Sequence, residues 1–223
     1  SSKLTKKKRF NNLDLKSKLG VDFFNSAYRA IGNDWYQNKY HNIASQNIIE
    51  PFGIFEFNHS SNEKIDYEIG FRYHYYELDT DNYTTKTSLS SDDRQNYAWS
   101  LGANYNLQNG QKLFTHVSRA YRSPRLDEII SLIKPSPSHT HIKHQYSNDI
   151  ELGYEVNVER KRYKASIFRT LIKNQIYLNQ TTLKNENFDP SIHQGLEIEF
   201  DQSINDKLNL KSNATFIDSY FTK

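Results

Sequence analysis

Apolar and polar residues alternate along most of the chain. In residues 64–78, KIDYEIGFRYHYYEL, Ile, Phe and Tyr occupy every second position, and mostly charged residues lie between them. A period of two predicts a β-strand with one apolar face. No segment keeps a helical period. The alternation predicts about nine strands, within residues 13–24, 48–59, 64–78, 95–107, 112–121, 148–158, 162–178, 194–202 and 208–221.

The connections between these runs alternate in length. Short sequences rich in turn residues, such as SSNEK, QNGQ, VERKR and INDK, alternate with long stretches at residues 31–47, 79–94, 122–144 and 179–191. Asn, Gly and Asp favour tight reversals of the chain. We therefore expect an antiparallel up-and-down sheet with its tight turns at one end and its long loops at the other.

The character of the two faces favours a membrane barrel over a soluble protein. Several runs reach about ten residues, as tilted membrane strands do, whereas strands of soluble proteins average about five or six. The 16 Tyr and 13 Phe suit interfacial girdles, and the charged opposite faces suit a wet interior. We predict an all-β fold: an antiparallel up-and-down transmembrane β-barrel, partial, with about nine strands of a larger barrel. A soluble β-sandwich stays open as the alternative, because its strands alternate as well.

Composition narrows the possible chemistry. The 29 Lys and Arg against 26 Asp and Glu give a net charge of +3, too small a bias to indicate nucleic-acid binding. The absence of cysteine excludes disulfides and thiolate sites. The chain has no Met, and its last residues, FIDSYFTK, stop within a strand pattern. We expect it to be an internal fragment of a longer protein.

Four short motifs follow one another in the second half of the chain. They are an aromatic-Arg-x-Pro box with an acidic residue shortly after it, a Glu-x-Gly pair, an Asn-x-Ile triplet and a Gly-aliphatic-Glu triplet. In this order and at these spacings, residues 113–216 resemble the β-barrel of TonB-dependent outer-membrane receptors, and residues 13–107 fit the same barrel by pattern alone. The residues that match are Tyr121, Arg122, Ser123, Pro124, Asp127 or Glu128, Glu151, Gly153, Asn174, Gln175, Ile176, Gly195, Leu196 and Glu197.

The resemblance implies an architecture. Residues 1–223 would be a central fragment of the receptor barrel, with no plug domain and no C-terminal strand. Short turns would face the periplasm and long loops the cell exterior. The strand that ends at Tyr121 would reach the outer surface, where Pro124, which has no N–H, ends strand pairing. Arg122 would face the interior and cap strand ends or meet a carboxylate of the plug.

The resemblance also implies a function and its partners. The family takes up scarce nutrients such as ferric siderophores, haem or cobalamin through the outer membrane of Gram-negative bacteria. Expected partners are the TonB energy-transducing complex, reached through the missing plug, the lipid bilayer with lipopolysaccharide, and a small nutrient ligand. We expect no enzyme activity, no cofactor and no nucleic acid. A passive porin and, less favoured, a soluble β-sandwich binding domain are the alternatives.

Two groups of residues are candidate ligand contacts in the expected extracellular loops. His139, His141 and His144 carry imidazoles, which suit copper, zinc or iron, although a polar surface loop that happens to hold three His is the favoured explanation and the metal is left unknown. Arginines near the outer rim can attract an anionic siderophore or bridge lipopolysaccharide phosphates, or simply be solvated. They are Arg94, Arg122 and Arg125, with Arg119 beside them.

Other charged or reactive residues are assigned simpler roles. The inward-facing Glu151 and Glu197 either wet the lumen or hold a plug. The basic segments at residues 5–10 and 159–162 are interpreted as solvated turns. His116 and Ser118 share a strand face but have no orienting third group, so they do not define a catalytic site.

Overall fold

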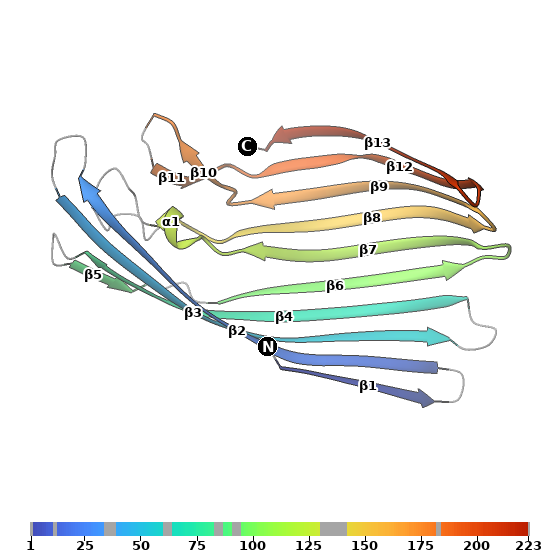
Figure 1. Ribbon diagram of the computed structural model, residues 1–223, viewed down its shortest axis with the longest axis horizontal. Coiled ribbons are helices and arrows are strands. Elements are labelled where there is room, and N and C mark those ends of the chain that lie inside the picture. Colours follow the sequence, from blue (N-terminus) through green and yellow to red (C-terminus); the bar gives the residue numbers. More distant parts are fainter. Residues whose placement is uncertain are drawn as a thin grey trace.

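The protein forms one long curved sheet (Figure 1). The computed structural model describes residues 2–10, 13–33, 39–59, 64–82, 87–90, 95–129, 142–181 and 184–222. Ten strands pair in the order in which they occur along the chain, each antiparallel to its neighbours. They are β1 (Ser2–Phe10), β2 (Leu13–Asn33), β3 (Lys39–His59), β4 (Ile65–Asn82), β6 (Gln95–Asn106), β7 (Gln111–Arg122), β8 (Gln145–Val158), β9 (Lys161–Lys173), β12 (Ser191–Asn205) and β13 (Leu208–Phe221).

Four short elements lie at the end of the sheet drawn on the left of Figure 1. Strand β5 (Thr87–Ser90) pairs with β4, and β10 (Ile176–Asn179) forms a separate hairpin with β11 (Lys184–Asn187). The single turn of helix α1 (Leu126–Ile129) follows β7. Over the described ranges, no helix has the length and apolar character needed to cross a bilayer.

The up-and-down topology is confirmed. The described tight turns, β6–β7, β8–β9 and β12–β13, all lie at the right end of Figure 1, and the β10 and β11 strands of the long β9–β12 connection lie at the left. At the β6–β7 turn, Asn109 and Gly110 have φ angles of 58° and 69°. Two successive left-handed residues with the sequence Asn-Gly are the signature of a type I′ hairpin, whose twist matches that of the flanking strands.

All nine predicted strands are present, but the basic segment at residues 5–10 was wrongly interpreted as a turn. It lies in β1, which pairs with β2 from Ser2 opposite Val21 to Phe10 opposite Leu13. Residues 6–9 are four consecutive basic residues, so no alternation of apolar and polar residues reveals the strand. Backbone pairing to β2 holds it instead.

Several predicted boundaries also differ from the structure; for example, β4 and β5 occupy part of the expected loop at residues 79–94. Residues 31–47 were expected to be a loop, yet β2 continues to Asn33 and β3 begins at Lys39. The buried positions there include Asn42, Ala44 and Gln46, small or polar residues that give little hydrophobic signal. Conversely, the run at 162–178 is broken at Asn174, whose φ of 55° ends β9, a conformation that Asn tolerates better than most residues.

The two faces of the sheet have opposite chemistry. On the apolar face, Phe71, Leu152 and Ile167 are each more than half exposed. Among the described elements, no second sheet packs on this face, as a soluble β-sandwich would require. The other face carries ion pairs such as Lys16–Glu56 and Arg162–Glu199. The fold is a partial barrel with an apolar exterior and a charged inner wall.

Candidate functional site

Strand β7 leaves the sheet at the outer rim and turns inward. It pairs with β6 only as far as Trp99 opposite Arg119, while its pairing with β8 continues to Arg122 opposite Gln145. Pro124, which lacks an N–H, follows directly and is buried. The chain beyond β7 therefore begins as a packed turn against the inner wall rather than as an open surface loop.

Helix α1 fills the interior of the rim. Its Leu126 and Ile129 are buried together with residues of β3 and β4 in one apolar cluster, with Tyr28 and Ile48 packed against it. The other members of this cluster are Ala44, Tyr76 and Leu78. Burial of these apolar side chains thus fixes the position of α1, and with it the positions of the polar residues Arg125 and Glu128.

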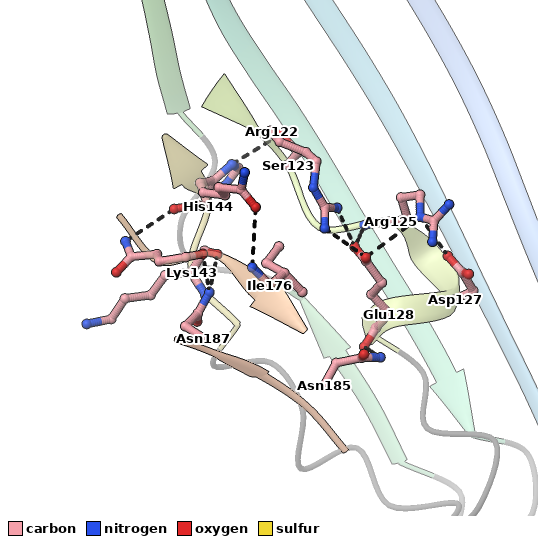
Figure 2. Close-up of polar contacts among 12 residues, drawn as sticks. Arg122, Ser123, Arg125, Asp127, Glu128, Lys143, His144, Ile176, Asn185 and Asn187 are labelled. Atoms are coloured by element: carbon pink, nitrogen blue, oxygen red, sulfur yellow. Dashed lines mark hydrogen bonds and ion pairs between the residues drawn. The ribbon is translucent and has the colours of Figure 1, made fainter. Parts of the chain in front are cut away.

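The arginine of the aromatic-Arg-x-Pro box closes this turn. Both terminal nitrogens of Arg122 bind the carboxylate of Glu128, at 2.7 and 2.9 Å, and the Arg125 backbone N–H donates to the same carboxylate at 2.8 Å (Figure 2). A bidentate guanidinium–carboxylate pair has a strict geometry. The carboxylate we expected Arg122 to find in a plug is supplied by Glu128 of its own chain.

The charge on Glu128 makes this turn sensitive to acid. Burial alone would raise the pKa of the Glu128 carboxyl, but hydrogen bonds from the Arg122 guanidinium and the Arg125 amide outweigh burial and hold the pKa below its usual value. A carboxyl with a depressed pKa stabilises the folded turn above its unfolded pKa of about 4.3. That contribution is lost as pH falls through the folded pKa.

We therefore expect α1 to open at low pH. Amide hydrogen exchange of Glu128 and Ile129, whose N–H groups donate to the Arg125 carbonyl, should lose protection between pH 5 and pH 3 after correction for intrinsic exchange. The Glu128→Gln variant, which cannot titrate, should show weaker protection and little change over this range. An identical pH response in both proteins would contradict the prediction.

A second polar group lies beside α1, centred on Glu50. Its carboxylate accepts hydrogen bonds from Arg72 at 2.6 Å and Tyr121 at 2.8 Å, and contacts His74 Nδ1 at 2.6 Å. Arg72 also binds Asp22 at 3.0 Å. Glu50 and His74 lie between the Ile49–Tyr75 and Phe52–Arg72 pairs of β3 and β4, so the sheet register brings them together.

Ser123 extends this group to His144, the residue before β8. Its hydroxyl lies 2.8 Å from His74 Nε2 and 3.1 Å from His144 Nδ1. The series Ser123, His74, Glu50 has the order of a nucleophile, a base and an acid. However, the hydroxyl is shared by two imidazoles, and Arg72 and Tyr121 already bind the carboxylate. Both imidazoles are almost fully buried. We therefore interpret these three residues as structural contacts that hold the end of β7 against β3 and β4.

The β10–β11 hairpin is tied to the same region through asparagines (Figure 2). Asn174 Nδ2 donates to the His144 carbonyl at 3.2 Å, and Asn187 Nδ2 donates to the Asn174 carbonyl at 2.8 Å. Asn187 also exchanges hydrogen bonds with the Lys143 backbone, and Asn185 donates to the Glu128 carbonyl at 2.9 Å. The asparagine of the Asn-x-Ile triplet thus joins β9 to the segment before β8.

The other motif residues shape the inner wall. Gly153 lies under the ring of Phe114, and Gly195 lies near the Phe168 ring and the Phe216 backbone carbonyl, so neither position has room for a side chain. Glu151 forms an ion pair with Lys164 at 3.4 Å. Glu197 borders a hollow between β12 and β13.

The predicted ligand contacts are only partly placed. Arg94, His139 and His141 lie outside the described residues. His144 is buried and bonded to Ser123, whereas Arg125 is exposed at the rim beside Asp127. Over the ranges that the structure describes, no three His, Asp or Glu side chains gather as a metal site.

Sequence reasoning did not single out Glu50, and it named His74 only as a residue of an alternating run. Glu50 and His74 both occupy polar positions of alternating runs and are separated from Ser123 by long stretches of chain. Only the register of β3 against β4, which no local pattern specifies, brings them under the end of β7.

Several solved structures share this fold. The ferric citrate transporter FecA, unliganded, matches with a TM-score of 0.74 and 12% identity, over 98% of this chain and 34% of that chain. The ferric yersiniabactin uptake receptor FyuA from Yersinia pestis matches at 0.70 and 13%, over 99% and 34%. The copper transporter OprC matches at 0.68 and 13%, over 97% and 36%. The chain therefore spans about a third of the length of these proteins.

Comparison with curated proteins found no match. A family model described as TonB dependent receptor-like, beta-barrel, matches residues 3–223, nearly the whole chain, and agrees with the partial barrel. The chain belongs to the TonB-dependent receptor β-barrel family.

Proposed function

We propose that residues 1–223 form a central part of the barrel of an outer-membrane receptor in a Gram-negative bacterium. The receptor takes up a scarce nutrient such as a ferric siderophore, haem or cobalamin with energy supplied by the TonB complex. The observation that carries the proposal is the distribution of side chains over the two faces of the sheet. Large apolar side chains point outward, while Arg–Glu and Lys–Glu pairs line the inside. Such a sheet suits lipid outside and a wet or plugged interior.

The structure of the rim suits a binding receptor. Helix α1 packs across the inner wall and is held by the Arg122–Glu128 pair. This braced turn offers a firm base for binding loops. The plug, through which TonB would act, and lipopolysaccharide are partners that the proposal includes.

Ligand capture is assigned to the outer end of the barrel. Arg125 is exposed there, and Arg94, His139 and His141 are proposed to join it in contacting an anionic ferric chelate or haem. Arg122 and His144 are proposed to position these residues, since both are already bonded within the rim.

The test is uptake of radiolabelled ferric chelates and haem by cells whose only receptor for them is the complete protein. Uptake should require both the receptor and TonB. The combined change of Arg94, Arg125, His139 and His141 to Ala should lower apparent affinity about tenfold or more, as expected for the loss of charge-assisted contacts.

Arg160→Ala is the matched control, because Arg160 lies in the tight β8–β9 turn at the opposite end and is paired with Asp206. It should leave uptake unchanged. Entry that proceeds equally in cells without TonB would overturn the proposal in favour of a passive porin.

A further inference from the structure

The departure of β7 from β6 leaves a notch on the outer face of the sheet. Beyond the Trp99–Arg119 pair, β6 and β7 no longer pair. The side chain of Tyr121 contributes nothing outside, because its hydroxyl binds Glu50 within the rim. The notch is a cleft of about 430 Å³ whose lining includes Tyr73, Tyr97, Arg119, Lys143, His144 and Tyr146.

Arg119 occupies this notch in an unusual state. Its guanidinium carbon lies 4.6 Å from the centre of the Tyr97 ring and 4.2 Å from that of Tyr146. Its Nε is buried without a hydrogen-bond partner among the described residues. Two rings thus hold the guanidinium group, and its Nε stays unsatisfied, which costs free energy.

The charge around the notch has one sign. Lys143 is exposed beside Arg119, and hydrogen bonds between its backbone and Asn187 fix its position. None of the described residues that line the cleft is acidic. Two cations, a histidine and three tyrosine rings therefore surround a space that holds no counter-charge of its own.

The height of Arg119 on the barrel indicates which anion reaches it. Arg119 is eight residues beyond Gln111, the first residue of β7, or about 27 Å along a strand. With a tilt of about 40°, this corresponds to about 20 Å of height, near the border of an apolar band about 25 Å tall. Interfacial arginines extend toward this border, where lipid phosphates lie.

We propose that the notch binds the phosphate of an anionic lipid headgroup in the outer leaflet. Arg119 forms charge-assisted hydrogen bonds to it, Lys143 adds a second cation, and Tyr97 and Tyr146 hold the guanidinium in place. The inference rests on the membrane orientation of the proposed function, but not on the identity of the nutrient. It names a specific site that faces lipid instead of the lumen.

The experiment compares phosphorylated lipid A with its enzymatically dephosphorylated form on the complete receptor purified in detergent, using native mass spectrometry. The wild-type receptor should retain the phosphorylated form at least about tenfold better, as expected for a charge-assisted bidentate contact. Arg119→Gln should abolish this preference. Arg119→Lys should retain part of it, because Lys keeps the charge but loses the planar fork.

Arg169→Gln is the matched control. Arg169 is exposed on the same outer face, two strands away and opposite Ile150, and it should be dispensable. Equal retention of both lipid forms by the wild-type receptor would overturn the proposal even if Arg119→Gln did not fold. Displacement of lipid A by micromolar inorganic phosphate would overturn the lipid assignment and identify a site for free phosphate. TonB-dependent uptake, measured separately, distinguishes a failure here from a failure of the proposed function.

Discussion

We expect Glu50→Ala to lower the free energy of unfolding of the barrel by about 3–5 kcal/mol, the usual cost of removing one partner from a buried charge pair. The substitution deprives Arg72, His74 and Tyr121 of a shared acceptor at once. Arg72 keeps Asp22, but the buried His74 and the Tyr121 hydroxyl lose their carboxylate. The loss should appear as a lower midpoint temperature for the heat-induced shift of the complete receptor on unheated-sample gels.

Glu56→Ala is the matched control for this prediction. Glu56 lies on the same strand and the same inner face, and it pairs with Lys16 at 2.7 Å. Both of these side chains are more than a third exposed, so their pair is worth about 1 kcal/mol or less. Equal destabilisation by the two substitutions would show that the Glu50 contacts stabilise the barrel no more than an exposed ion pair does.

Alternation along the strands predicted most of the fold because each long strand separates apolar exterior from polar interior. It predicted β4 and β8 well, where Ile, Tyr and Leu alternate with charges. It could not find β1, where four basic residues follow one another, or the extension of β3 through Asn42 and Gln46, whose burial arises from tertiary packing. Local sequence reports a strand only when its faces differ.

The site was predictable in its parts and not in its assembly. Tyr121, Arg122 and Glu128 stand close together in the sequence, and their motif identified the rim. That Arg122 pairs with Glu128 required the inward path of α1, which Leu126 and Ile129 set by burial. The contact of Tyr121 with Glu50 depends on the register of several strands, and a difference of one residue would turn Glu50 outward.

The separation of Arg119 from Tyr121 was not apparent from the sequence either. Strict alternation places Arg119 and Tyr121 on one face, together with Val117. The structure separates them, because β7 bends after Arg119 and directs the Tyr121 hydroxyl to Glu50. The end of β7 therefore has side chains on both faces of the sheet. Tyr121 contacts Glu50 on the inner face, and Arg119 places a cation on the outer face.

Gly153→Ala should destabilise the barrel by about 1–3 kcal/mol, the typical cost of overpacking. A Cβ at Gly153 would overlap the ring of Phe114 and lie 2.9 Å from the Ala165 carbonyl oxygen. The ring can move, but the backbone oxygen of the neighbouring strand can move only with the sheet. The Phe114 ring and the Ala165 carbonyl oxygen thus explain why the Glu-x-Gly pair has a glycine at position 153. Thermal unfolding of the complete receptor on gels measures the loss.

Two comparisons make the Gly153 prediction specific. Gly102→Ala changes another glycine on the inner face of a strand, where the nearest atoms to the added Cβ lie at 3.8 Å or beyond, so its effect should be small or slightly stabilising. Phe114→Leu removes the ring, and when combined with Gly153→Ala it should cost less than the sum of the two single changes. This coupling is the sign of a shared contact. Additive effects would mean that Phe114 does not explain the glycine and that the Ala165 carbonyl alone excludes a side chain there.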